Sequence, residues 1–222
     1  MENYKKNLEI LKKNHVYSEE MEHDACGVGL IASTEGKKSR KVVEYGIEAL
    51  KAVWHRGAVD ADGKTGDGAG IHVEIPKDFF IEKIEVTGHS YDNSEICVGM
   101  IFLPRNDYAA QESCKTIVES ELTKNDFSIY GWRQVPVNPK VLGEKAFQTM
   151  PEIIQVLFKS NNPELLNKDL ERKIYETRRI IENKAFQVSL NNFYICSLSS
   201  KSIIYKGMFL AEAISDFFLD LK

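Results

Sequence analysis

Residues 57–75 read GAVDADGKTGDGAGIHVEI, a loop followed by an alternating apolar segment. The first part of this stretch is a loop dense in glycine and aspartate, and its last part alternates between apolar and other side chains. That two-residue period is typical of a half-buried β-strand. Because glycine permits positive φ angles and close backbone approach, the loop can present N–H groups to an anion or wrap another main chain. A solvent-exposed turn is the alternative interpretation of the same composition.

The sequence on either side of this stretch predicts further strands and helices. Residues 26–33, CGVGLIAS, are small and apolar and predict a buried strand, and a helix follows from the N-cap candidate Ser39. Further strands are predicted at 69–75, 95–104, 127–137 and 152–160. A short helical turn is predicted from Pro76, and helices are predicted at 107–124, 163–186 and 210–222. Residues 191–200 and 201–208 are predicted to form a hairpin. Strands mixed with a few helices, without a strict βαβ rhythm, predict one α+β domain with largely antiparallel sheets.

Composition places the chain among folded globular proteins. Of its 222 residues, 43% are hydrophobic and 28% are charged, and the net charge is −4. That balance gives no positive field to hold DNA or RNA, so nucleic-acid binding is not expected. The apolar run at 96–103 is far shorter than the roughly 20 residues of a membrane span. The charged N-terminus lacks the apolar stretch of a secretory signal, which predicts a cytoplasmic protein with no membrane partner.

One cysteine and the glycine loop are the candidates for chemistry. Cys26 is followed by Gly27 at the start of the predicted strand, although a cysteine in such a place is more often a packing thiol. Arg56 follows an apolar helix, and a fixed guanidinium beside a cysteine would favour the thiolate. The motif TGDGAG at 65–70 lacks the Lys-Ser/Thr of a phosphate-binding loop and precedes a strand, so nucleotide binding is disfavoured.

The remaining cysteines are Cys97, Cys114 and Cys196, and they give no metal-binding pattern. They form no CxxC pair, and no histidine stands near them at zinc-finger spacing. No metal site is therefore expected. Cys97 and Cys196 lie in strand-like apolar runs and are predicted core thiols, and Cys114 is predicted on a helix face.

Three motifs together resemble one known family. They are DACGVGLIAS at 24–33, ALKAVWHRGAVDADGKTGDGAGIHVEIPKDFF at 49–80 and YGWRQVPV at 130–137, and they resemble the N-terminal glutaminase domain of glutamate synthase large subunits. The resemblance continues in order to the end of the sequence and covers nearly all of it. Cys-Gly and His-Arg-Gly alone fit any class II glutamine amidotransferase, including sugar and purine enzymes. TGDGAG with GWR-x-VP favours glutamate synthases.

The resemblance implies a fold and a division of the chain. The expected fold is that of an amino-terminal-nucleophile hydrolase, an αββα sandwich of two antiparallel sheets between helical layers, incomplete at its C-terminal end. Residues 1–25 would be a propeptide-like leader, and residues 26–222 a partial class II glutamine amidotransferase domain. Removal of the leader would give Cys26 a free α-amine, whose usual pKa of about 7.7–8.0 suits a general base near neutral pH.

The resemblance also implies a reaction and the residues that serve it. The Cys26 thiolate would attack the carboxamide of L-glutamine, ammonia would leave, and water would hydrolyse the γ-glutamyl thioester. The implied residues that bind substrate or support the nucleophile are Gly27, Arg56, Gly66, Asp67 and Gly68. The ammonia would feed glutamate biosynthesis in a separate synthase domain. FMN and an iron–sulfur cluster belong to that domain, and no cofactor is expected in this chain.

The sequence also departs from the family pattern. Family members continue into a segment with a glutamine-binding arginine and an Asn-Gly pair that forms the oxyanion hole, and this sequence contains no Asn-Gly dipeptide. Loss of one oxyanion donor lowers hydrolase rates by about 10²–10³. The isolated chain is therefore expected to be nearly inactive without a separately encoded remainder of glutamate synthase. The alternative function is that of an inactive truncated remnant or an interaction module.

Overall fold

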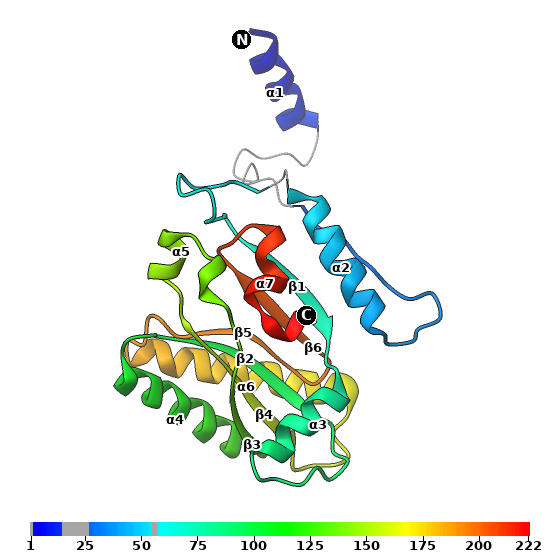
Figure 1. The fold of residues 1–222 in the computed structure, drawn as a ribbon, viewed down its shortest axis with the longest axis vertical. Helices are drawn as coiled ribbons and strands as arrows, with labels where there is room; N and C mark the ends of the chain where they lie inside the picture. The colour runs from blue at the N-terminus through cyan, green and yellow to red at the C-terminus, as the bar shows by residue number, and fades with distance from the viewer. Residues whose placement is uncertain (1, 15–26, 55–56) are drawn as a thin grey trace.

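Two antiparallel sheets form the centre of the computed structural model, which describes residues 2–14, 27–54 and 57–222 (Figure 1). The larger sheet has four strands in the order β3 (Phe127–Gln134), β4 (Glu152–Ser160), β2 (Cys97–Leu103) and β5 (Tyr194–Ser199). The smaller sheet pairs β1 (Ala69–Glu74) with β6 (Ser202–Gly207). The predicted class, helices with antiparallel sheets, is confirmed.

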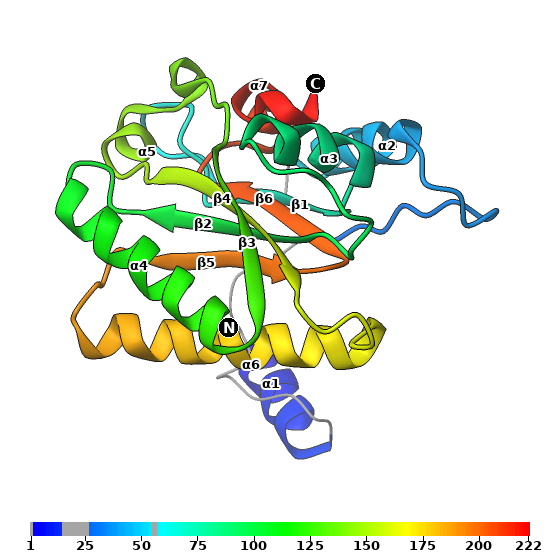
Figure 2. The same cartoon turned by 90° about the horizontal axis from the view of Figure 1, so that it is seen from below.

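Two long helices cover one face of the four-stranded sheet (Figure 2). They are α4 (Tyr108–Lys124) and α6 (Asn167–Gln187), and both were predicted from the recurrence of apolar residues on one helix face. The core beneath them includes the fully buried side chains of Ile101, Phe158 and Ile174. Burial of each such side chain contributes about 1.5–3 kcal/mol, which is what holds the helices to the sheet.

Three shorter helices lie on the opposite side of the strands (Figure 2). They are α2 (Arg40–Ala52), α3 (Lys77–Val86) and α7 (Ile214–Phe217). A second core joins these helices to the smaller sheet. In this core the rings of Tyr205 and Phe218 pack edge to face, with their centroids 5.1 Å apart. The remaining short elements are η3 (Pro139–Val141), α5 (Glu144–Gln148), η4 (Ala211–Ala213) and η5 (Leu219–Leu221).

The strand predicted at 26–33 is wrong for the residues of it that the structure describes. Residues 27–33 have no regular secondary structure, and the side chains of Val28 and Leu30 are 91% and 89% exposed. A segment becomes a strand only when a neighbouring strand satisfies its backbone, and no described strand pairs with this one. Apolar composition alone therefore overestimated its burial.

The predicted hairpin at 191–208 is also wrong in its pairing. The chain turns between β5 and β6 as expected, but β5 pairs with β2 and β6 pairs with β1. The carboxylate of Glu171 fixes the turn by accepting hydrogen bonds from the Ser200 amide (2.7 Å) and the Ser199 hydroxyl (2.9 Å). Pairing with β1 lets β6 bury Ile203 and Tyr205 in the second core.

The helix predicted at 210–222 is broken into η4, α7 and η5. Phe218 is extended (φ −88°, ψ 103°) and forms an isolated bridge with Val137. The Leu219 amide donates to Pro136 O (3.1 Å), so the chain exchanges helical hydrogen bonds for bonds to a neighbouring segment. The break lets side chains on several sides of the segment, such as Phe217 and Leu221, enter the core together.

The N-terminal segment contains helix α1 (Glu2–Asn14), which lies within the predicted leader. In Figure 1 it stands apart from the sheets. The predicted boundary between leader and domain, at residues 25 and 26, lies outside the described residues and stays a prediction. Among the helices of the described ranges, none has the length and apolar character needed to cross a bilayer.

Candidate functional site

The glycine loop that precedes β1 closes on itself through its backbone. Val59 and Gly66 form an isolated antiparallel bridge. One residue further out, the amide of Asp67 donates to the carbonyl of Ala58 (3.2 Å). The two ends of the loop are therefore held together, and the interpretation as a structured loop is favoured over that of a free turn.

Gly66 is buried where the loop crosses another part of the main chain. A Cβ atom at this position would lie 2.7 Å from Phe209 O and 3.1 Å from Leu210 N. Both atoms belong to the backbone and cannot move aside cheaply, so only glycine fits. Gly68 has φ +133°, a conformation that side-chain-bearing residues rarely adopt. The close backbone contact at Gly66 and the positive φ of Gly68 explain why both positions require glycine.

A tight turn at the tip of the loop is organised by Asp62. Its carboxylate accepts hydrogen bonds from the amides of Lys64 (2.9 Å) and Thr65 (2.7 Å) and from the Thr65 hydroxyl (2.6 Å). The amide of Asp60 closes the turn by donating to Thr65 O (2.9 Å). The Thr65 hydroxyl and the backbone amides hold the pKa of the Asp62 carboxyl well below its usual range. Asp62 is thus ionised at neutral pH and accepts all three bonds.

The predicted site residues fall into two groups. Gly66, Asp67 and Gly68 lie together in the loop, and Asp67 Oδ1 is 3.2 Å from where a Cβ on Gly57 would lie. Gly57 directly follows Arg56, but Arg56 and Cys26 lie outside the described residues, so their predicted meeting stays a prediction. Gly27 is described, and it is exposed at the start of the irregular segment 27–33.

The family model for glutamine amidotransferases class-II matches residues 26–222, which is nearly all of the chain. The chain belongs to this family. The match begins at Cys26, the cysteine that the sequence singles out, and it includes the whole glycine loop.

Relatives of this class II amidotransferase chain are glutamate synthases. The chain is 53% identical over 218 residues to the glutamate synthase [NADPH] large chain of Azospirillum brasilense, which covers 98% of this chain and 14% of that protein. It is 40% identical to ferredoxin-dependent glutamate synthase 1 of Arabidopsis thaliana, with 90% of this chain and 12% of that protein covered. Ferredoxin-dependent glutamate synthase 2 of Synechocystis sp. is 38% identical, with 90% and 13% covered. The chain therefore spans about one-eighth of the length of these relatives.

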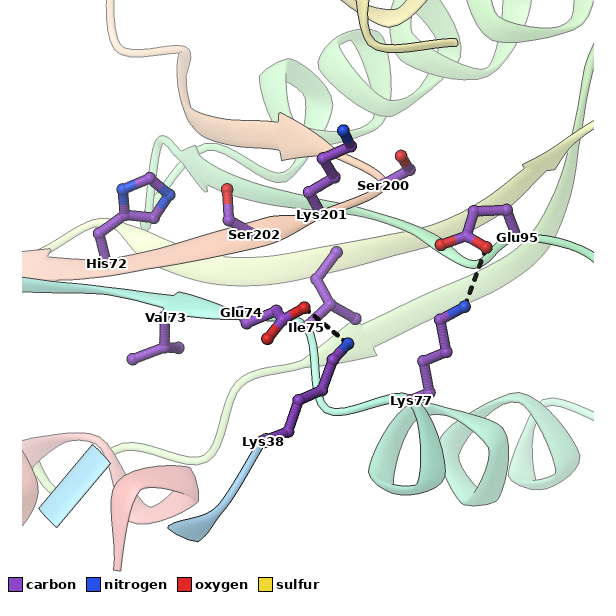
Figure 3. A pocket seen from close by; sticks show the side chains of 10 residues that line it. All are labelled: Lys38, His72, Val73, Glu74, Ile75, Lys77, Glu95, Ser200, Lys201 and Ser202. Carbon is purple, nitrogen blue, oxygen red and sulfur yellow. Dashed lines mark hydrogen bonds and ion pairs between the residues drawn. The ribbon is translucent and has the colours of Figure 1, made fainter. Parts of the chain in front are cut away.

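A cleft of about 550 Å³ in this amidotransferase chain lies at the far end of β1 from the glycine loop (Figure 3). Two ion pairs cross its walls, one between Lys38 and Glu74 (2.6 Å) and one between Lys77 and Glu95 (2.9 Å). None of the predicted site residues that the structure describes lines it. The glycine loop precedes β1 and the cleft lies at the other end of that strand, so the cleft is separate from the described site residues Gly66, Asp67 and Gly68.

The three cysteines that the structure describes are buried and free of disulfide bonds. Burial raises the pKa of Cys114 and of Cys196 to about 11 and raises the pKa of Cys97 still further above its usual value. These thiols stay protonated at neutral pH and are poor nucleophiles. The predicted packing role of Cys97 and Cys196 is confirmed, and Cys114 lies on a buried face of α4.

Sequence reasoning identified the loop but missed the residues that hold it. Asp62 and Thr65 fix the turn at its tip, and Gly143 lies against both of them. The pattern Asp-x-Lys-Thr within a glycine loop carries a local signal, since aspartate side chains often accept from amides two or three residues ahead. Gly143 is distant in sequence and gives no such signal.

Proposed function

We propose that the chain is the glutaminase part of a glutamate synthase, in which Cys26 attacks the amide of L-glutamine. Family membership supports glutamine as the substrate, because class II members are amidotransferases that use it. The observation that carries the assignment of Cys26 is the state of the other thiols. Cys97, Cys114 and Cys196 are buried and protonated at neutral pH, which leaves Cys26 as the candidate nucleophile of the four cysteines.

The proposed reaction proceeds through a thioester. The Cys26 sulfur forms a bond to the amide carbon of glutamine, and the C–N bond breaks as the nitrogen takes up a proton and leaves as ammonia. Water then hydrolyses the thioester, so glutamate leaves and the thiol is restored. The proposed general base is the α-amine of Cys26, which exists only after residues 1–25 are removed. One residue would then supply both nucleophile and base.

The glycine loop supplies the surroundings of this thiol in the proposal. Gly66, Asp67 and Gly68 would border the substrate, and Arg56 with Gly27 would support the thiolate. The buried Gly66 and the bridge at its backbone favour a rigid loop, and rigid positioning is what an acyl-transfer site requires. The αββα sandwich of amino-terminal-nucleophile hydrolases remains the proposed fold type for residues 26–222.

The ammonia is proposed to pass to a synthase domain that carries FMN and an iron–sulfur cluster and lies outside these 222 residues. The donor set of the described residues does not fit a cluster. No three histidine, cysteine, aspartate or glutamate side chains gather there for a metal, and the described thiols are buried in the cores. The proposed partner is the remainder of glutamate synthase, and a cytoplasmic location is proposed for both.

Selective alkylation tests the proposed function. In the presence of the remainder of glutamate synthase, we expect an electrophilic glutamine analogue to form an adduct at Cys26, L-glutamine to slow this labelling, and D-glutamine to leave it unchanged. Peptide mass spectrometry locates the adduct, and the Cys26→Ser variant is the matched control. Cys97, Cys114 and Cys196 should stay unlabelled in the folded protein, because their thiols are buried.

The opposite result would favour the alternative function. If Cys26 reacts with the glutamine analogue no faster than with iodoacetamide, and L-glutamine gives no protection, the chain has no glutamine site. It would then be an inactive remnant or an interaction module of the same family.

A further inference from the structure

The turn at 60–65 is docked on a distant part of the chain, residues 143–146. A Cβ on Gly143 would lie 2.3 Å from Asp62 Oδ2 and 2.3 Å from Thr65 Oγ1, so the two segments are in direct contact. The amide of Ala146, in α5, donates to the Thr65 hydroxyl (3.3 Å). The hydroxyl of Thr65 therefore links the turn to α5, because it donates to Asp62 and accepts from Ala146.

The contact between the turn and α5 is buried at its centre, and an ion pair lies at its edge. Thr65 is only 2% exposed. At the rim, Lys145 donates to Asp60 (2.7 Å), and this hydrogen bond lowers the pKa of Asp60 and raises that of Lys145. Exposed ion pairs contribute little to stability, so the buried hydroxyl is the main polar link between the turn and α5.

The docked turn leads directly into the predicted site residues. Thr65 precedes Gly66, which is fixed on its other side by the backbone of Phe209 and Leu210. The loop is thus held between two independent contacts, one through Thr65 and one through Gly66. Because a displacement of about 1 Å can lower rates by about 10²-fold, a loop that carries substrate contacts needs such support.

We propose that Asp62 and Thr65 are positioning residues of the glutaminase site, which hold Gly66, Asp67 and Gly68 in place through the contact with Gly143 and Ala146. This inference rests on the proposed function. In this proposal neither side chain contacts the reacting atoms. Asp62 orients the Thr65 hydroxyl, and that hydroxyl fixes the loop against α5.

The matched pair Thr65→Val and Thr65→Ser tests this role. Valine keeps the shape and removes the hydroxyl, whereas serine keeps the hydroxyl. We expect Thr65→Val to lower the rate constant of Cys26 labelling by the electrophilic glutamine analogue by about tenfold or more, and Thr65→Ser to stay within about twofold of the parent chain. Labelling of Cys26 by iodoacetamide, which needs no glutamine site, should change by less than about twofold in both.

Cys26 labelling is measured over a range of glutamine-analogue concentrations, so that the kinetics of the folded fraction are distinguished from a loss of folded protein. A merely structural role would expose Cys97 and Cys114 to iodoacetamide and leave the kinetics of the folded fraction unchanged. Should Thr65→Val fail to fold, Asp62→Asn takes its place, because its amide nitrogen cannot accept a hydrogen bond from the Thr65 hydroxyl. We expect that variant to show the same selective loss.

The outcomes distinguish the two proposals. No selective labelling of the parent chain overturns the proposed function. Selective labelling of the parent that is unchanged in the folded Thr65→Val or Asp62→Asn variant overturns the positioning role alone. Loss of selective labelling in Thr65→Val together with its retention in Thr65→Ser supports the positioning role.

Discussion

Replacement of Asp220 by asparagine is expected to lower the free energy of unfolding by about 3 kcal/mol. Asp220 in η5 forms a bidentate ion pair with Arg133 of β3, with distances of 2.6 and 2.8 Å. The two side chains are only 6% and 14% exposed. Asparagine keeps the shape but leaves the buried guanidinium without its counter-charge, and an uncompensated buried charge is among the most destabilising changes in a protein. Urea denaturation gives the difference.

An exposed ion pair in the same chain provides the matched control for Asp220. Arg40 and Glu44 lie one helical turn apart in α2, with side chains 45% and 53% exposed. Glu44→Gln should lower the free energy of unfolding by less than about 0.5 kcal/mol. If the Asp220→Asn and Glu44→Gln effects prove equal, the ion pair to Arg133 does not hold η5 against the sheet.

Replacement of Gly66 by alanine is expected to lower the free energy of unfolding by about 1–3 kcal/mol and to abolish selective labelling of Cys26. The new Cβ would lie 2.7 Å from Phe209 O and 2.8 Å from its carbonyl carbon, well inside van der Waals contact. These are backbone atoms two residues beyond the end of β6, so the loop must move. Thermal melting followed by circular dichroism measures the stability, and the glutamine analogue measures the site.

Gly29→Ala is the stability control for this substitution, because nothing lies within 4 Å of its would-be Cβ. Its melting temperature should match that of the parent chain. A Gly66→Ala protein with the parent's melting temperature and labelling rate would contradict the close contact between the loop and residues 209–210.

Local sequence patterns predicted the helices and strands that need only some apolar core to pack against. The apolar face of α6 and the alternation of β1 were sufficient, since a periodic face needs only some core to cover it. Residues 27–33 have the composition of a strand but no described strand beside them. Phe218 breaks a helical pattern because it bridges to Val137, a contact that no local pattern encodes.

The candidate site likewise contains residues that local motifs indicate and residues that only the fold brings together. The sequence indicated Gly66, Asp67 and Gly68, because glycine density and the TGDGAG motif are local features. It did not indicate that Gly143 and Ala146 support them, since that contact joins residues about 80 positions apart. Asp62 carries a local turn signal, but its place in a buried contact depends on the fold.

The N-terminus of the purified protein tests most directly the claim that Cys26 acts through its own thiol and amine. Intact-mass spectrometry and N-terminal sequencing determine which residue begins the chain. The proposed function predicts a protein that begins at Cys26, without residues 1–25, and a thiol that an electrophilic glutamine analogue modifies. A protein that still begins at Met1, with Cys26 unreactive, would contradict it.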